Sequence, residues 1–411
     1  MAHRMLAVLL PLFDEEMAVG SYSLFSQKEN KFLNPFLIST GINDSVGRIE
    51  GLDIIENVGM TTLSGNKSIF VPVNNISLFT DIDSIGFAQH SKLVLLIDTS
   101  VAPTEMYAQR IRELKALDFK FAICKLRVRD FEEYRIILSL MDYIYLDYTK
   151  VDITKARIYF NKVYPNIKLI AENIQSVDDF ETLRKNGDYH LFEGPFYRLP
   201  ITKGDTRVAP IKINYIQLIN TVNDPDFNLT DAADIISRDT ALVISLLKMV
   251  NNISINSKIT SIRHAAAMLG QKELKKWITT AVTKELCYDK PNEIMRLSLI
   301  RAKFAENLAE SFDMKIHEQE LFLMGLFSVL DIILSTTMSV ALDMVNVEKP
   351  IYDALLNNSG DFYKVLNFIQ VYDNADFSEI NRLEIVDNID TSKAYDAYKD
   401  ALVWFEMVFR D

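Results

Sequence analysis

Short apolar runs alternate with longer mixed segments from Met5 to about Pro200. The runs are rich in Val, Ile, Phe and Leu, as buried strands are, and segments such as Glu105–Leu117 between them have helical spacing. The predicted strands are Met5–Leu12, Ser68–Val73, Lys92–Ile97, Lys120–Ile123, Tyr143–Leu146, Lys168–Ile170 and His190–Phe192. This alternation predicts a closed parallel βα barrel, in which chemistry lies at the carboxyl ends of the strands.

The pattern changes after the polar segment Thr202–Pro210. Beyond it, apolar residues such as Leu246 and Val250 recur three or four positions apart, which indicates helices. We therefore predict an α/β barrel over residues 1–203 and an all-α domain over 207–411, joined by a hinge. Aromatic residues near the C-terminus predict that the final helix docks.

Composition narrows the class of protein. The 411 residues are 49% hydrophobic, enough for substantial cores, yet no run reaches the ~20 apolar residues that cross a bilayer. The acidic residues Asp14–Glu16 stand where a secretory peptide would carry its cleavage site, so we expect a cytoplasmic protein without membrane insertion. The net charge of −12 disfavours nucleic acid and favours a protein partner with a basic surface. The oligomeric state is left open.

Three carboxylates follow predicted strands: Asp98, Asp147 and Glu172. Metal-assisted hydrolysis needs several carboxylates converging on one or two cations. In an acidic chain, however, scattered carboxylates are more simply solvated or paired. Glycine-rich phosphate loops and the G-x-S-x-G motif are absent from the sequence. We therefore predict no cofactor and no metal site.

Both halves of the chain carry motifs of known families. In the barrel half the segments are Pro11–Asp14, Tyr22–Phe25, Ala171–Gln175 and Glu193–Phe196, which are similar to motifs of EAL domains. In the helical half the match is denser, and the segments Ile235–Asp239, Leu246–Asn252, Ile259–Ile262 and Phe322–Ser328 resemble HDOD domains. The sequence therefore resembles two-domain bacterial signalling proteins in which an EAL domain is fused to an HDOD domain. This resemblance implies an EAL-type barrel followed by an HDOD helical domain.

Active EAL domains are cyclic di-GMP phosphodiesterases, and the resemblance locates their functional positions in this chain. Ser23 stands where the family has the glutamate of E-A-L, and Gln27 stands where it has a substrate-binding arginine. Leu96 stands at a metal-binding glutamate, and Tyr145 stands at the catalytic lysine.

Further positions complete the comparison. Cys124 and Lys125 occupy the places of the paired aspartates. Asn74 and Glu172 match family residues, whereas Gln175 replaces the second glutamate of A-E-x-V-E. Glu193 begins the segment that resembles the closing motif. The resemblance thus implies a degenerate site with no catalytic residues and no metal.

We expect a non-catalytic signal-transduction protein that acts through protein contacts, with a degenerate EAL domain and an HDOD docking domain. The alternative is a cyclic di-GMP receptor that binds without hydrolysis. Gln27 in place of the arginine removes phosphate recognition, so tight binding is not expected. Lys125 is expected to pair with Glu172 across the barrel mouth.

Overall fold

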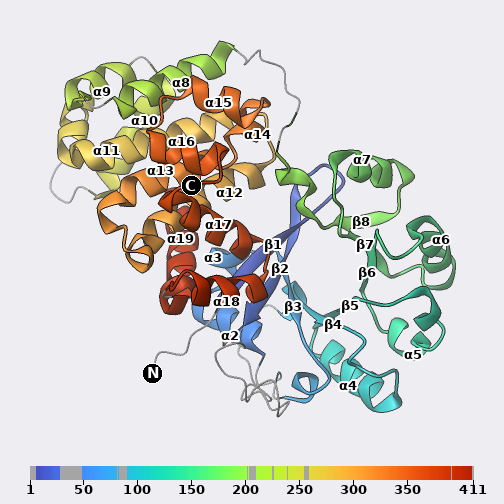
Figure 1. Ribbon diagram of the computed structural model, residues 1–411. Helices are drawn as coiled ribbons and strands as arrows, with labels where there is room; N and C mark the ends of the chain where they lie inside the picture. Colours follow the sequence, from blue (N-terminus) through green and yellow to red (C-terminus); the bar gives the residue numbers. More distant parts are fainter. Residues whose placement is uncertain are drawn as a thin grey trace. The chain divides into compact units, whose positions relative to one another are not determined.

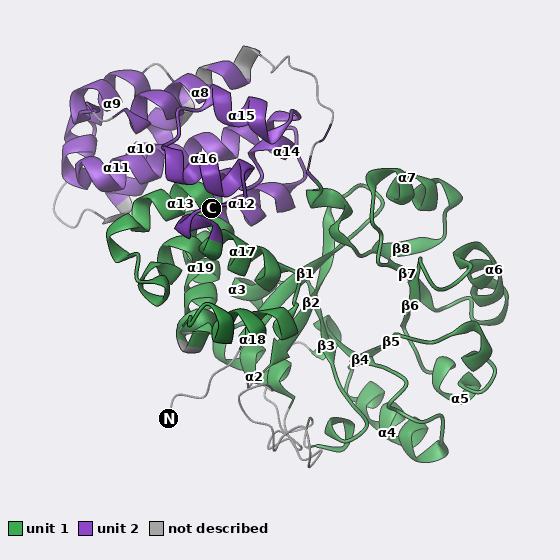
Figure 2. Ribbon diagram, in the orientation of Figure 1, with its two compact units in different colours: residues 1–199, 300–325, 364–411 green, residues 200–299, 326–363 purple. Residues whose placement is uncertain are grey.

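The structure is a computed structural model, and it describes residues 6–27, 49–80, 82, 90–200, 202, 210–224, 226–237, 239–253, 259–389 and 391–409. The interior of the expected hinge, residues 203–209, lies outside the described residues. The chain forms two compact units (Figure 2). The barrel unit comprises residues 1–199, 300–325 and 364–411, and the helical unit comprises residues 200–299 and 326–363.

Eight strands close into a barrel (Figure 1). They are β1 (Leu6–Phe13), β2 (Val19–Gln27), β3 (Ser68–Pro72), β4 (Leu93–Ile97), β5 (Lys120–Ile123), β6 (Tyr143–Asp147), β7 (Lys168–Glu172) and β8 (Tyr189–Phe192). The seven predicted strands are confirmed to within two residues at either end, and β2 was missed. Together with the helical C-terminal region, the barrel confirms the predicted fold class of α/β plus all-α.

Strand β1 departs from the predicted all-parallel barrel. It runs antiparallel to both β2 and β8, whereas all other neighbouring strands are parallel. The expectation was wrong here because β1 and β2 are joined by a tight turn, which leaves no room for a crossover helix. In this turn the Asp14 side chain accepts hydrogen bonds from the backbone N–H groups of Glu16 and Ala18, each at 2.9 Å.

The outer edge of β1 is covered by C-terminal helices. β1 pairs with β8 only at Phe13 and Phe192, so most of this edge lacks a strand partner. The Tyr372 hydroxyl donates to the Ala7 carbonyl at 2.9 Å and accepts from the Ala7 N–H at 3.1 Å. The Tyr398 hydroxyl accepts from the Leu9 N–H at 3.4 Å. These tyrosines belong to α17 (Asp361–Asp373) and α19 (Ala394–Phe409), so both helices seal the edge.

A buried charge cluster joins three separate stretches of the barrel unit. Asp373, at the end of α17, lies 2.6 Å from the Arg301 guanidinium on α12 (Asn292–Leu308). Arg198, in the turn after β8, donates to the Asp373 carbonyl at 3.1 Å and to the Asn374 side chain at 2.7 Å. The buried Asp373 carboxylate thus lies beside two guanidinium groups, and their attraction offsets the cost of removing its charge from water.

The other helices of the barrel unit follow the amphipathic pattern that the sequence predicts. In α4 (Glu105–Ala116), for example, Ala108, Ile111 and Leu114 are buried, at helical spacing. The Asp152 side chain caps the helix that begins at Ile153, and the Ser176 side chain caps the helix that begins at Val177. The other α-helices that the structure describes in this unit are α2 (Glu50–Val58), α3 (Met60–Ser64), α5 (Arg135–Leu138), α6 (Ile153–Val163), α7 (Val177–Asn186), α13 (Glu318–Phe327) and α18 (Phe377–Val386).

The helical unit contains the expected α-helices. They are α8 (Pro210–Asn223), α9 (Leu229–Ile236), α10 (Thr240–Ile253), α11 (Ile262–Leu286), α14 (Leu330–Leu334), α15 (Met338–Met344) and α16 (Lys349–Leu356). Leu246 and Val250 are fully buried, as their spacing predicted. α11 is kinked at Gly270, whose φ of 75° favours glycine.

The compact units differ from the division predicted at residues 203–207. Residues 300–325 and 364–411, expected in the helical domain, pack within the barrel unit. The final helix docks, and the edge of β1 is one of the surfaces that it contacts.

Candidate functional site at the barrel mouth

A cavity of about 470 Å³ opens at the carboxyl ends of the parallel strands. Its lining includes most of the positions that the family resemblance singled out, namely Ser23, Asn74, Leu96, Cys124, Lys125, Tyr145, Glu172 and Glu193. The barrel therefore brings together residues that are up to 170 positions apart in sequence. Chemistry in such barrels lies at this end.

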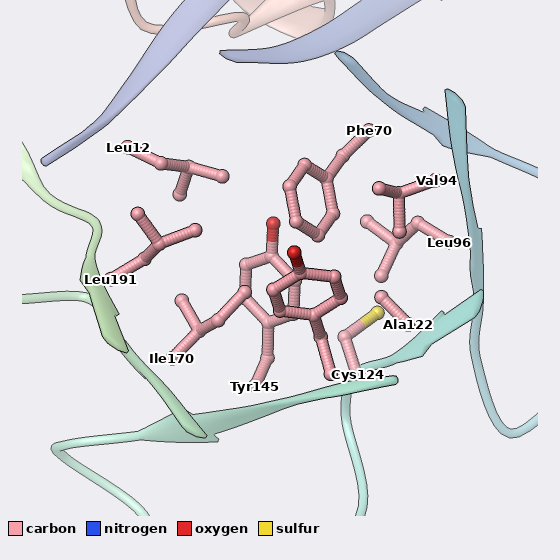
Figure 3. Close-up of a cluster of buried hydrophobic side chains, with 10 residues drawn as sticks. Leu12, Phe70, Val94, Leu96, Ala122, Cys124, Tyr145, Ile170 and Leu191 are labelled. Atoms are coloured by element: carbon pink, nitrogen blue, oxygen red, sulfur yellow. The ribbon is translucent and has the colours of Figure 1, made fainter. Parts of the chain in front are cut away.

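The floor of the cavity is apolar and electrically neutral. Leu96, Cys124 and Tyr145 belong to the buried cluster that fills the barrel (Figure 3). The Tyr145 hydroxyl lies 3.2 Å from the Ser23 hydroxyl in a buried hydrogen bond. Burial raises the pKa of Tyr145 well above its ordinary value, and burial together with Glu172 raises the pKa of Cys124 to about 12. Both groups are therefore protonated at neutral pH.

Lys125 pairs with Asp98, so the expected pair with Glu172 is wrong. The Lys125 Nζ lies 2.8 Å from Asp98 Oδ2. The reason is strand order, because β5 lies next to β4, which ends just before Asp98, whereas Glu172 ends β7. Burial opposes ionisation of Asp98, but the hydrogen bonds from Lys125 and Ser100 prevail and lower its pKa. The lysine of the cavity is thus already neutralised.

Two further carboxyl groups line the cavity. Burial, followed by the charges of Glu193 and Asp147, raises the pKa of Glu172 from 4.5 to about 7. Burial also raises the pKa of Glu193, although the Asn173 N–H donates to this carboxylate at 3.1 Å. Among the described residues, the Glu172 carboxylate has no hydrogen-bond or ion-pair partner, although its backbone carbonyl accepts a hydrogen bond from the Tyr148 N–H at 3.0 Å.

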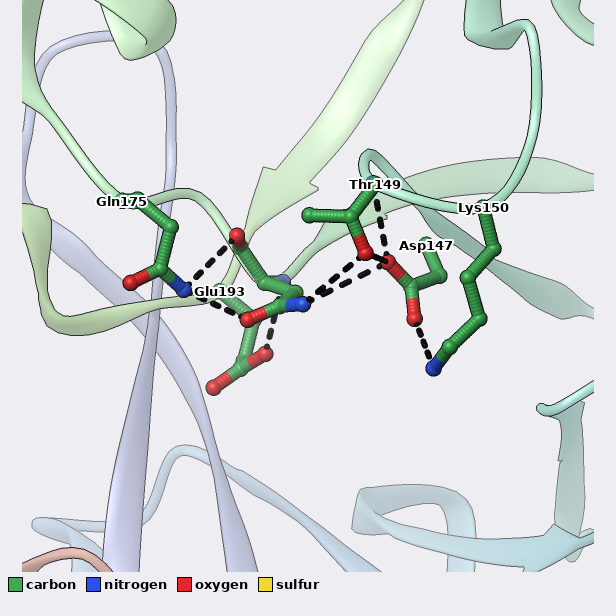
Figure 4. A network of polar contacts seen from close by, with 6 residues as sticks. Asp147, Thr149, Lys150, Gln175 and Glu193 are labelled. Carbon is green, nitrogen blue, oxygen red and sulfur yellow. Dashed lines mark hydrogen bonds and ion pairs between the residues drawn. The ribbon is translucent and has the colours of Figure 1, made fainter.

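A polar network adjoins the site (Figure 4). Lys150 pairs with Asp147, and the Asn173 amide donates to Asp147 Oδ1 at 3.4 Å. Gln175 donates to the Asn173 carbonyl at 3.1 Å. Two predicted site positions do not line the cavity. They are Gln175, which belongs to this network, and Gln27.

The acidic side chains do not converge as metal ligands would. Over the described ranges, no group of three or more His, Cys, Asp or Glu side chains is placed to hold a metal ion. Mg²⁺ prefers near-octahedral oxygen ligation, which Leu96, Cys124 and Lys125 cannot supply.

Sequence reasoning did not single out four of the lining residues, namely Phe25, Pro72, Val73 and Ser100. Phe25 lies two positions after Ser23 on β2, so the strand period of two would have placed both on one face. The small and polar residues Gly20, Ser21 and Ser23 interrupt the apolar pattern of β2, so the sequence does not predict a strand there. Ser100 lies beyond the end of β4, where no periodicity applies.

Comparison with known proteins bears first on the helical half. Residues 209–347 match the family model of the HDOD domain. The helical half contains an HDOD domain. This confirms the HDOD part of the resemblance, which the motifs in α9, α10 and α13 had indicated.

No helix in the described part of the chain has both the length and the apolar character needed to span a bilayer.

Two relatives extend the comparison beyond the HDOD domain. The chain is 23% identical over 403 residues to the uncharacterized protein YuxH of Bacillus subtilis strain 168, covering 96% of each chain. It is 29% identical over 217 residues to the cyclic di-GMP phosphodiesterase CdgJ of Vibrio cholerae serotype O1, covering 52% of this chain and 50% of the relative.

Solved structures of EAL domains are similar in part. The EAL domain protein from Listeria monocytogenes EGD-e is 15% identical, with a TM-score of 0.37, over 47% of this chain and 87% of that chain. The barrel of this chain is established by its own strand pairing.

Proposed function

We propose that this chain is a non-catalytic signal-transduction protein that acts through protein contacts. In this proposal the EAL-like barrel is degenerate, and the barrel and the HDOD domain are docking platforms. The relation to CdgJ and the HDOD match support a place in cyclic di-GMP signalling.

The observation that carries the proposal is the composition of the barrel mouth. Metal-assisted hydrolysis of a phosphodiester, the reaction that the resemblance implies for active EAL domains, needs bound metal and an activated water. Leu96, Cys124 and Lys125 line the cavity where the resemblance implies acidic metal ligands. A neutral, buried Tyr145 bonded to Ser23 stands where it implies a catalytic lysine. The retained Glu172 and Asn74 are too few to hold a metal pair.

A hydrolysis assay tests the proposal. We expect the purified chain, given cyclic di-GMP with Mg²⁺ or Mn²⁺, to form no linear dinucleotide above the level of a Glu172→Ala variant. An active EAL phosphodiesterase is the positive control. Metal-dependent product from the wild-type chain that Glu172→Ala abolishes would sink the non-catalytic proposal.

The alternative is a receptor that binds cyclic di-GMP without hydrolysis. One observation favours it, namely the open cavity of about 470 Å³ at the mouth. The charges oppose it, because the single lysine in the lining is paired with Asp98. We expect calorimetry to show no binding near 1 μM, about −8 kcal/mol. A dissociation constant at or below that value would establish the receptor function instead.

The partner expected for the docking function has a basic surface. The chain carries a net charge of −12, and complementary potentials accelerate and select association. Proteins captured by the full chain at low salt are therefore expected to be released at about 1 M salt, where charges are screened beyond about 3 Å.

A further inference from the structure

We propose that the barrel-mouth cavity binds a small organic cation, a primary ammonium or guanidinium compound, and not a phosphodiester. This inference rests on the proposed function in one respect, that the mouth carries no catalytic metals. It assigns to the same cavity a ligand class opposite in charge to cyclic di-GMP.

The balance of charge inside the cavity supports a cation. Lys125 and Asp98 cancel at 2.8 Å, which leaves Glu172 and Glu193 as the remaining ionisable carboxyl groups of the lining. No hydrogen bond or ion pair from any described residue ties down the Glu172 carboxylate. The Glu172 side chain is half-buried, so its carboxylate loses part of its hydration without gaining a protein partner, and a bound cation offsets that cost.

The nearest external cations are already engaged. The charge of Lys150 lowers the pKa of Glu172, but the Lys150 ammonium forms its ion pair with Asp147. The charge of Arg198 lowers the pKa of Glu193, but the Arg198 guanidinium donates its hydrogen bonds to the Asn374 side chain and the Asp373 carbonyl. Neither side chain lines the cavity, so neither takes the place of a ligand.

The geometry favours an organic cation over a metal ion. In the part of the chain that the structure describes, the acidic groups of the mouth are not gathered into a metal-binding set. An ammonium or guanidinium group is satisfied by one or two carboxylate oxygens together with neutral acceptors. The Ser23 and Ser100 hydroxyls supply such neutral groups in the lining.

The walls suit the rest of such a ligand. Phe25 and Tyr145 contribute aromatic rings, which attract cations at their faces. Val73 and Leu96 add apolar surface for an alkyl chain. A volume of about 470 Å³ is ample for a compound with a short alkyl chain.

Binding of simple probes to the full chain tests the proposal. The cationic probes are agmatine and n-butylammonium, and the controls of equal chain length are 1-butanol and butyrate. We expect calorimetry at neutral pH to give dissociation constants of roughly 1 mM or tighter for a cationic probe. We expect no measurable binding of butanol, butyrate or Mg²⁺.

Substitution locates the site. Glu172→Gln keeps the shape of the side chain and is expected to weaken binding of the cation at least about tenfold. The matched control is Glu56→Gln, which removes the same charge from an exposed position on α2 and is expected to leave binding unchanged. Both variants are compared with wild type by circular dichroism.

Every outcome of these binding measurements either supports or overturns the proposed cation site. Selective binding of a cationic probe that Glu172→Gln weakens and Glu56→Gln does not would support the proposal. No binding of either cation, equal binding of butanol, displacement of the cation by Mg²⁺, or binding unaffected by Glu172→Gln would overturn it. The hydrolysis assay on the same preparations separates the two proposals, because an inert chain that ignores both cations overturns the cation site alone.

Discussion

Glu172 shows how a single side chain can carry information that motif comparison does not. The resemblance identified it as a retained family residue, whereas the structure shows a carboxyl whose pKa burial raises to about 7. The same side chain is then a cost to folding once it ionises. That cost is measurable without knowing any ligand.

We expect Glu172→Gln to stabilise the chain at alkaline pH. Since the folded-state pKa of about 7 exceeds the ordinary 4.5, folding takes up a proton between these values, and wild-type stability falls as the pH rises through this window. The glutamine variant lacks this loss. Its advantage in free energy of unfolding should grow from near zero at about pH 4 to at most about 3 kcal/mol at about pH 8.

Urea unfolding of wild type, Glu172→Gln and Glu56→Gln across this range measures the effect. Glu56→Gln removes the same charge from an exposed position and is the matched control. If Glu172→Gln exceeds wild type in free energy of unfolding by the same amount at about pH 4 and at about pH 8, the raised pKa of Glu172 is contradicted.

At the scale of elements, most of the barrel could be predicted from sequence. β4 and β5 are buried runs of Val, Ile, Leu and Phe, which are typical of strands covered on both faces. β2 could not, because Gly20, Ser21 and Ser23 interrupt its apolar pattern. The family resemblance located eight of the cavity positions, but not the Lys125–Asp98 pair, which depends on strand order.

The cover over β1 makes a prediction about Tyr372. Tyr372→Phe leaves the N–H and carbonyl of Ala7 buried without their partner. Loss of a buried hydrogen-bond partner costs about 1–3 kcal/mol, so we expect unfolding to be easier by that amount. Tyr288→Phe removes a hydroxyl from a side chain that is 80% exposed and serves as the control. Equal stability of the Tyr372 variant and wild type by chemical unfolding would show that β1 does not need this cover.

At the scale of the whole molecule, the division into units changes what a fragment can do. The helical periodicity predicted two contiguous domains, and the sequence offered no sign that residues 300–325 and 364–411 belong with the barrel. Local patterns report how an element buries its own face. They do not report which distant segment covers it, and here the contacts join residues 365 positions apart.

A barrel fragment of residues 1–203 is therefore expected to be unstable. It lacks Tyr372 and Tyr398, which cover β1, and Asp373, which pairs with Arg198. We expect it to unfold at a lower temperature than the full chain, or without a cooperative transition, when followed by circular dichroism. A fragment that unfolds cooperatively at the temperature of the full chain would contradict the cover that the C-terminal helices provide.

The cover over β1 also bears on the order in which the chain is made. β1 leaves the ribosome before the tyrosines that satisfy its outer edge, which follow their partners by 365 and 389 positions. Until then, the edge presents unpaired N–H and carbonyl groups to other nascent chains, as aggregation-prone intermediates do. Slow translation of the C-terminal stretch should lengthen this exposure, and the chain's dependence on chaperones should rise with it.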